Sequence, residues 1–282
     1  MSEPIDVTKS IKQHYTRSDL ADSILAALVA SGKNVEQLTI EDLEPVDEFH
    51  VRRGEATLEL ARAVGLRADM HILDVGSGIG GPSRRIAHEF GCRVTGIDLT
   101  DEYCRTATAL AERVGLSNLV TYRQGNALDL PFPSNTFDVV WTQHASMNIP
   151  DKSRLYREMF RVLKSAGRLA IYDILAGPAG PVHFPVPWSR RPDTSFLQAP
   201  DDLRRALEAA GFSVLLWRDA TDAALAWFTA LSKNIQQGGL PPLGIHLLLG
   251  PDFPTMARNQ VRNLQEDRIV LVQIVASKAT VT

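Results

Sequence analysis

The chain has 282 residues, of which 44% are hydrophobic and 22% are charged, and its formal net charge is −3. These values are ordinary for a globular protein of one large or two small domains. They show no excess of basic residues that would indicate a nucleic-acid partner. The polar N-terminus and the lack of a long apolar run predict neither a signal peptide nor a membrane span, so we expect a cytoplasmic protein.

Residues 1–64 have the pattern of a helical leader that covers the remainder of the chain. Apolar side chains recur every three or four positions in two stretches, which predicts two helices, and Gly32 and Gly65 are placed to end them. Between these helices, residues 41–45 predict an acidic connector. The segment after the connector carries His50, which we consider a candidate pocket residue.

The stretch from residue 71 to residue 90, HILDVGSGIGGPSRRIAHEF, predicts a strand, a glycine-rich turn and a helix in succession. An apolar run ends on Asp74, and Pro82 opens the helical pattern. The glycines of the turn are Gly76, Gly78, Gly80 and Gly81. A unit of this kind brings a ligand to backbone N–H groups at the N-terminus of a helix.

The carboxylate of Asp74 favours one ligand for this turn. The spacing Gly76-x-Gly78-x-x-Gly81 also fits the fingerprint of dinucleotide-binding proteins, so NAD remains an alternative. A carboxylate two residues before the first glycine would repel a pyrophosphate, whereas it would attract an ammonium group. S-adenosylmethionine (SAM) has an ammonium and a sulfonium and no phosphate, so the turn favours SAM. A turn that serves packing alone, with Asp74 capping the helix, is the third reading.

After residue 90 the predicted strands and helices alternate, which is the pattern of a parallel sheet with helices on both faces. We expect strands over 92–97, 119–123, 137–142 and 167–174, with helices over 101–114 and 152–163 between them. A helix over 201–210 and strands over 212–217 and 268–277 follow.

Two excursions interrupt this alternation, at 176–200 and 219–266. The first contains six prolines, which limit the entropy of a long loop, so we expect it to be ordered and near the site. The second predicts an aromatic helix around Trp227 and Phe228 and another helix near its end. These two side chains and Trp188 are expected in the core rather than against a substrate.

The stretch from Asp74 to Gly80, DVGSGIG, resembles the first motif of class I SAM-dependent methyltransferases. Asp98 at a strand end, Gly-Asn-Ala at 125–127 and Phe-Asp-Val-Val from 137 extend the resemblance. The nearest likeness is to the small-molecule branch, with its quinone and tocopherol C-methyltransferases and its glycine, sarcosine and dimethylglycine N-methyltransferases. The resemblance implies SAM as cofactor and an α/β fold with a seven-stranded, mostly parallel, doubly wound sheet whose last strand is antiparallel.

The resemblance also implies a set of SAM-binding residues. In that family an acidic residue placed like Asp98 accepts hydrogen bonds from ribose hydroxyls, and the Asp of a Gly-Asp-Ala step reads the adenine amino group. Asn126 departs from that Asp, although its side-chain carbonyl can accept the same bond. The implied set is Asp74, Gly76, Ser77, Gly78, Gly80, Asp98, Leu99, Asn126, Ala127 and Gln143.

These patterns lead us to expect methyl transfer from SAM to a small-molecule acceptor by in-line displacement at the sulfonium methyl, with an O, N or C nucleophile. His144 follows a predicted strand at the mouth of the site and is the candidate catalytic base. An NAD-dependent oxidoreductase and a non-catalytic SAM-binding protein are the rival interpretations.

The expected organisation is a leader over 1–64 and a SAM-binding methyltransferase domain over 65–282 with the two insertions. Cys92 and Cys104 have neither disulfide nor metal-ligand spacing, so we expect no metal site. A homodimer is left open.

Overall fold

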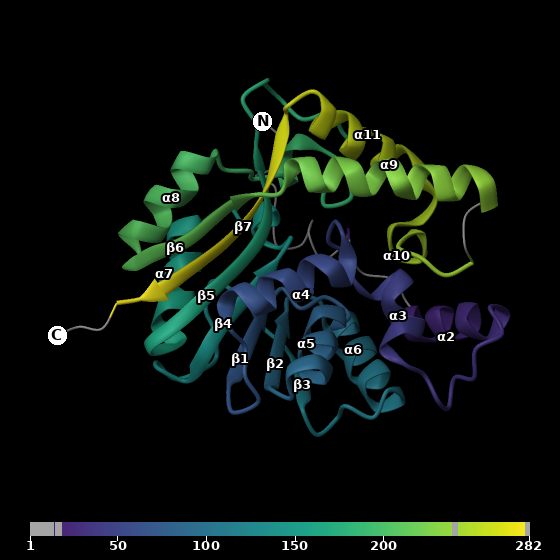
Figure 1. The fold of residues 1–282 in the computed structure, drawn as a ribbon, viewed down its shortest axis with the longest axis horizontal. Helices are drawn as coiled ribbons and strands as arrows, with labels where there is room; N and C mark the ends of the chain where they lie inside the picture. The colour runs from purple at the N-terminus through teal and green to yellow at the C-terminus, as the bar shows by residue number, and fades with distance from the viewer. Residues whose placement is uncertain (1–13, 15–18, 239–241, 280–282) are drawn as a thin grey trace, which may run out of the picture.

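A seven-stranded sheet forms the centre of the molecule, with helices on both of its faces (Figure 1). The computed structural model describes residues 14, 19–238 and 242–279, with the backbone alone for 235–238. The strands are β1 (His71–Val75), β2 (Arg93–Asp98), β3 (Val120–Gln124), β4 (Phe137–Gln143), β5 (Leu163–Ala176), β6 (Phe212–Asp219) and β7 (Ile269–Lys278).

The strand order is β3-β2-β1-β4-β5-β7-β6. Strand β7 runs antiparallel to β5 and β6, whereas the remaining neighbours pair in parallel. The predicted sheet with an antiparallel last strand is therefore confirmed. Its order reverses between β1 and β4, and open α/β sheets bind ligands beyond the carboxyl ends of the strands at such a point.

The helices give the sheet two separate cores, because successive side chains of a strand point to opposite faces. Ile72 packs with Leu60 in one core, and Leu73 packs with Leu155 in the other. Helices α4, α5 and α6 cover the first face, and α7 and α8 cover the second. Their bounds are α4 (Arg53–Val64), α5 (Gly81–Phe90), α6 (Asp101–Arg113), α7 (Lys152–Val162) and α8 (Pro200–Ala209).

The leader begins, within the described residues, with helix α2 (Leu20–Ala30). Its apolar face buries Leu20, Ile24 and Leu28 in a third cluster, together with Leu110 of α6 and Leu248 of the second insertion. The predicted helix is confirmed, and it joins the leader to the insertion (Figure 1).

The segment predicted as an acidic connector is instead helix α3 (Ile40–Asp47). Thr39 and Asp42 form a capping box at its start, in which each side chain accepts a hydrogen bond from the other residue's backbone N–H. The helix buries Ile40, Leu43 and Val46. The prediction of a connector was wrong because the acidic residues and Pro45 suggested a loop, whereas the spacing of the apolar residues is that of a helix.

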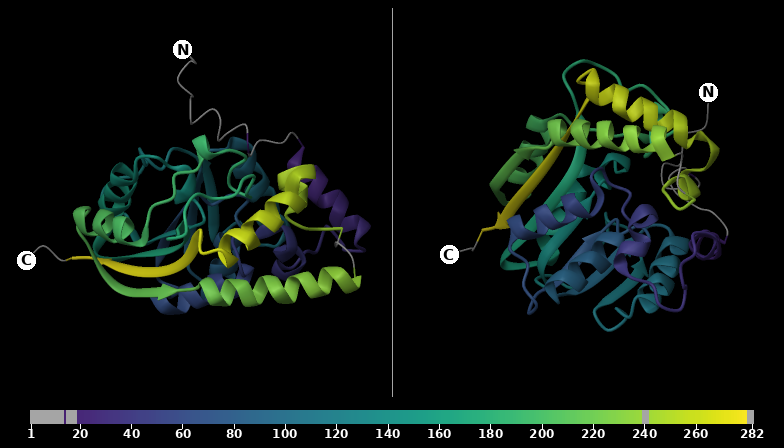
Figure 2. Two further views of the ribbon diagram at one scale, coloured as in Figure 1. Left: turned by 90° about the horizontal axis from the view of Figure 1, so that it is seen from above. Right: turned by 45° about the vertical axis from the view of Figure 1, so that its right-hand side comes forward.

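The two insertions are ordered where the structure describes them. The first contains η2 (Pro192–Thr194), and the backbone N–H of Ala176 donates to Gln198 O over 2.8 Å, which closes the loop at its base. Within the second, α9 and α11 lie side by side (Figure 2). Its elements are α9 (Thr221–Gly238), α10 (His246–Leu249), η3 (Gly250–Asp252) and α11 (Phe253–Gln265). The predicted GGLPPLG turn lies partly outside the described residues, at 239–241.

None of the helices in the described ranges is long and apolar enough to cross a membrane. Among the same residues, no cluster of three or more His, Cys, Asp or Glu side chains could hold a metal ion.

Candidate active site

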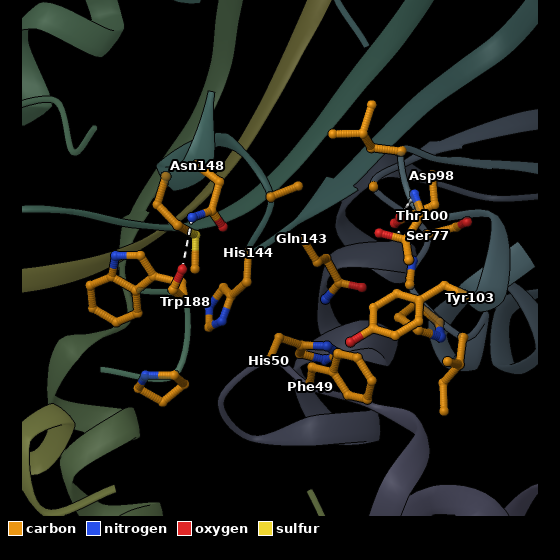
Figure 3. A pocket seen from close by; sticks show the side chains of 18 of the residues that line it. Phe49, His50, Ser77, Asp98, Thr100, Tyr103, Gln143, His144, Asn148 and Trp188 are labelled. Carbon is orange, nitrogen blue, oxygen red and sulfur yellow. Dashed lines mark hydrogen bonds between the residues drawn. The ribbon is translucent and has the colours of Figure 1, made fainter. Parts of the chain in front are cut away.

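A cavity lies at the carboxyl ends of β1, β2, β3 and β4, where the strand order reverses (Figure 3). Nine of the predicted site residues line it: Gly76, Ser77, Gly78, Asp98, Leu99, Asn126, Ala127, Gln143 and His144. Two predicted residues, Asp74 and Gly80, do not line it. The structure therefore brings nine of the eleven predicted residues to the wall of one cavity.

The glycine turn is held by the end of β2. The N–H groups of Gly76 and Ser77 donate to Ile97 O over 2.8 and 3.1 Å, and Gly78 N–H donates to Asp98 Oδ2 over 2.9 Å. These three backbone donors are therefore engaged within the protein. A pyrophosphate needs such donors, so the turn suits SAM better than NAD.

Positive φ values of 78°, 54° and 84° at Gly76, Gly78 and Gly80 explain why glycines occupy the turn. A Cβ atom on Gly76 would also lie 2.5 Å from the Cβ of Ala145, which follows β4. The turn and the segment after β4 are thus in close contact, and glycine is required between them.

Asp74 lies beneath the turn and is almost fully buried, with 2% of its surface exposed. Its Oδ2 accepts a 2.6 Å hydrogen bond from the hydroxyl of Ser83 in α5. Burial raises the pKa of Asp74 to about 7, and the nearby carboxylate of Asp98 adds to the effect. A cation at the turn would favour ionised Asp74, whereas a phosphate would add a third negative charge.

Asp98 ends β2, and both of its carboxylate oxygens accept backbone hydrogen bonds. Oδ2 accepts from Gly78, and Oδ1 accepts from Thr100 over 2.9 Å. Burial raises the pKa of Asp98, while these two bonds oppose the rise. Thr100 is the N-cap residue of α6, and its side chain makes no capping hydrogen bond. Its backbone N–H instead donates to the carboxylate of Asp98. Each oxygen retains a lone pair that a ribose hydroxyl can use.

Asn126 lies on the exposed rim of the cavity, after β3. Its Oδ1 accepts a 2.9 Å hydrogen bond from Leu128 N–H, which fixes the orientation of the amide. The second lone pair of that oxygen remains open to an amino group.

Three buried polar atoms of residues that line the cavity have no hydrogen-bond partner among the described residues: Ser77 Oγ, Gln143 Nε2 and His144 Nε2. Gln143 is oriented by Trp141, whose indole N–H donates to Oε1 over 2.9 Å, so its two amide N–H groups are left for a ligand. Buried polar groups are usually satisfied, and the Ser77 and Gln143 atoms fit a polar cofactor such as SAM, which carries carboxylate and ribose oxygens.

His144 leaves β4 with a left-handed backbone, at φ 46°. Its ring stacks on Tyr172 with centroids 5.0 Å apart, and its Nε2 has no hydrogen-bond partner in the described part of the chain. Burial and the neighbouring His50 hold the pKa of His144 well below its ordinary value of 6.5. The imidazole is therefore neutral near neutral pH.

The remainder of the cavity wall was largely missed by sequence reasoning, because it comes from the leader and the insertions. His50 had been singled out, and it does line the cavity. The other wall residues include Phe49, Tyr103, Met147, Pro187, Trp188, Ile245, Leu248, Leu249 and Gln260. Trp188, expected only in the core, is buried and also lines the cavity, whereas Trp227 and Phe228 pack in the first core.

The first insertion is tied to the segment after β4. Phe196 N–H donates to Met147 O over 2.7 Å, and the side-chain amide of Asn148 donates to Trp188 O over 2.8 Å. These bonds place the apolar wall beside His144 (Figure 3).

Two buried ion pairs attach α3 and the residue after it to α5. Arg84 pairs with Asp47, and Arg85 pairs with Glu48. Arg84 is fully buried and also donates to Ile79 O over 2.7 Å. The leader is thereby fixed to the helix that begins at the glycine turn.

Comparison with known proteins agrees with this geometry. Residues 73–171 match the family model described as a methyltransferase domain. The chain is 28% identical to sarcosine/dimethylglycine N-methyltransferase of Halorhodospira halochloris over 76% of this chain and 75% of that one. It is 31% identical to sterol 24-C-methyltransferase of Aspergillus fumigatus over 71% of this chain, but it spans only 52% of that relative.

Solved structures share the fold across nearly the full length. The [4+2]-cyclase SpnF superposes with a TM-score of 0.71 at 23% identity, covering 96% of this chain and 97% of that one. Geranyl diphosphate C-methyltransferase of Streptomyces coelicolor A3(2) gives a TM-score of 0.71 at 16% identity, covering 99% and 100%.

Together, the sheet order, the acid-glycine turn and these comparisons support a SAM-dependent methyltransferase that acts on small molecules.

Proposed function

We propose that the protein transfers the methyl group of SAM to an uncharged, largely apolar small molecule. One observation carries the proposal: the cofactor end and the acceptor end belong to a single cavity. The cofactor end has the glycine turn and Asp98, which suit a cationic nucleoside. The acceptor end has apolar walls from three separate segments, represented by Phe49, Trp188 and Leu248.

The charges of the wall support an uncharged acceptor. Asp47 and Asp98 are the charged side chains among the described residues of the wall, and Asp47 is already paired with Arg84. A carboxylate or diphosphate on the acceptor would have to be desolvated against apolar side chains, which is costly. An acceptor of the sterol type therefore fits better than an amino acid such as sarcosine.

When bound, SAM would supply a sulfonium methyl group that an O, N or C nucleophile attacks in line, with the neutral thioether as the leaving group. The residues of the chain align the two molecules and exclude water from the reacting atoms. We propose that Gln143 and Ser77 hold polar groups of the cofactor and that His144 contacts the acceptor, either as base or as orienting group.

The leader 1–64 and the insertions 176–200 and 219–266 are proposed to form a cover over a SAM-binding domain spanning 65–282. Support comes from the cavity wall, to which each of these three segments contributes. Closing such a cover excludes water from the site.

We also propose a cytoplasmic location and no nucleic-acid partner. Cys92 and Cys104 are both buried and unpaired, which suits a reducing compartment. The net charge of −3 gives no general attraction to nucleic acid. A homodimer remains a proposal that light scattering in solution would test.

The experiment is a competition between acceptor classes. Purified protein is incubated with methyl-labelled SAM and either uncharged apolar alcohols, phenols and sterols, or glycine, sarcosine, dimethylglycine and geranyl diphosphate. We expect labelled product from the uncharged set. Product from the charged set alone would contradict the proposed acceptor class.

A further inference from the structure

Three buried polar side chains form a cluster behind the acceptor end of the cavity. Glu48 and His50 belong to the segment between α3 and α4, and Thr57 belongs to α4. Their exposed fractions are 1%, 3% and 0%. Of the three, His50 lines the cavity, where its ring lies near that of His144 with centroids 6.0 Å apart (Figure 3).

The hydrogen bonds of His50 fix its tautomer. Its Nε2 lies 2.8 Å from the carbonyl oxygen of Arg53, and a carbonyl can only accept, so Nε2 carries the proton. In the neutral ring, Nδ1 must then carry the lone pair. That atom has no hydrogen-bond partner among the described residues, and the ring that bears it lines the cavity.

A carboxylate lies on the protonated side of the same ring. Glu48 Oε2 is 3.3 Å from His50 Nε2 and accepts a 2.8 Å hydrogen bond from the hydroxyl of Thr57. The other oxygen, Oε1, accepts from Arg85, so the orientation of the carboxylate is fixed from two sides. A carboxylate placed in this way stabilises the imidazolium that forms when the opposite nitrogen takes a proton.

The backbone beside this cluster is strained. Arg52 and Arg53 have φ values of 67° and 44°, in a region that L-residues seldom adopt. The bond from His50 to Arg53 O spans this turn, and the guanidinium of Arg52 is held by Glu55 and Glu59. Strain of this kind persists where the surroundings hold it, and it is frequent at functional sites.

His144 lacks a comparable environment. No carboxylate forms a hydrogen bond or ion pair with its ring in the described part of the chain, and its titratable neighbours are His50 and Tyr172. An imidazolium on His144 would therefore form without a counter-charge.

We propose that His50 is the catalytic base, that Glu48 is its positioning residue, and that the acceptor carries an ionisable O–H or N–H group. This inference rests on the proposed methyl transfer. The acceptor heteroatom attacks the methyl carbon, the carbon–sulfur bond breaks, and its electron pair stays on sulfur as a neutral thioether. The acceptor proton moves to His50 Nδ1 and later leaves to water.

Several groups set the protonation of His50. Burial lowers its pKa, Glu48 and the Arg53 carbonyl oppose the fall, and the charges of Arg85 and Arg53 add to it. The polar groups that contact or face the ring are Glu48, Arg53, Thr57, Arg85, His144 and Tyr172. The base is therefore neutral at physiological pH, and its activity falls only as the pH drops through this lowered pKa.

The test compares His50→Gln with His144→Gln and with His88→Gln, which changes an exposed histidine of α5 as a matched control. Glutamine at position 50 can keep the N–H donor to Arg53 O while it removes the base. We expect His50→Gln to lower kcat by roughly 10²–10⁴ with little change in the SAM dissociation constant. The acid limb of kcat should vanish in His50→Gln and move to lower pH in Glu48→Gln.

A second measurement needs no acceptor. Long-range ¹H–¹⁵N correlation spectra of ¹⁵N-histidine-labelled protein with S-adenosylhomocysteine should show His50 protonated at Nε2. Protonation at Nδ1, or wild-type kcat in His50→Gln with a methylated acceptor, would overturn the assignment. Failure of the whole acceptor panel would instead contradict the proposed function, and the spectrum would still decide the tautomer.

Discussion

At the scale of single residues, Asp74 and Asp98 are two buried carboxyl groups at the site. Burial disfavours the ionised form of each. Asp74 and Asp98 lie at the ends of adjacent strands, and each has a raised pKa. A cationic ligand relieves both, which explains why an acid-glycine turn selects SAM.

Asp74 gives a prediction with a defined pH dependence. Burial raises the pKa of Asp74 to about 7, and the attraction of the SAM ammonium that we propose for it requires the ionised carboxylate. The SAM dissociation constant should therefore rise by up to about tenfold for each pH unit below neutrality, because protons compete with the ligand. Calorimetry of Asp74→Ala should show severe loss of binding in a folded protein. Unchanged affinity would refute the role.

The same shift affects stability. Because the folded pKa of Asp74 lies above its ordinary 3.8, the free protein should lose stability as the pH rises from about 4 to about 7. Asp74→Asn should reduce that loss, as thermal unfolding across this range would show.

Asp98 and Asn126 should differ in their contribution to cofactor affinity. Asp98→Ala removes a charged acceptor and should weaken SAM by about 1–3 kcal/mol, whereas Asn126→Ala removes a neutral one and should cost less. Calorimetry measures both. A larger loss for Asn126→Ala would reverse the assigned roles.

His144 should affect turnover more than binding, since it lies at the acceptor end. With His50 as base, His144→Ala should lower kcat without removing the acid limb of the pH profile. Steady-state kinetics would show this. Full activity in His144→Ala would exclude the residue from the site, and a lost acid limb would make it the base instead of His50.

At the scale of elements, the leader is fixed to α5 by charge. Asp47→Ala would leave Arg84 buried without its partner, and we expect a loss of about 3–5 kcal/mol in unfolding free energy. The control is Asp101→Ala, which breaks an exposed pair with Arg105 and should leave the unfolding free energy almost unchanged. Equal losses in denaturant unfolding would contradict the role of the buried pair.

The insertions should respond to the cofactor. Because Trp188 and Leu248 line the cavity, hydrogen exchange in 176–200 and 225–250 should slow when S-adenosylhomocysteine binds. The same expectation applies to 8–20, of which residues 8–13 and 15–18 lie outside the described residues. Identical exchange with and without ligand would argue against a cover.

At the scale of the whole molecule, the sequence predicts those features that depend on short stretches of the chain. The seven strands, the glycine turn and most helices follow from apolar periodicity and from residues such as Gly65 and Gly91 that end helices. Helix α3 was missed although Thr39 and Asp42 offered its capping box. The engaged N–H groups of the turn could not be predicted, because their acceptor is Ile97 O on another strand.

The apolar part of the cavity wall could not be predicted either, because it also depends on contacts between distant segments of the chain. That part joins the leader, the segment after β4 and both insertions, which lie far apart in the sequence. Pairs such as Arg84 with Asp47, separated by 37 positions, leave no local pattern. The cavity wall around the glycine turn could thus be predicted from local sequence patterns, whereas the apolar part of the wall required the tertiary structure.

The most direct test of methyl transfer is mass spectrometry of turnover with SAM deuterated at the methyl group, using the uncharged acceptors and comparing the wild-type protein with Asp74→Ala. We predict S-adenosylhomocysteine and an equal amount of acceptor carrying the labelled methyl group, both lost in Asp74→Ala. An acceptor converted without the label, or with SAM left intact, would contradict the account.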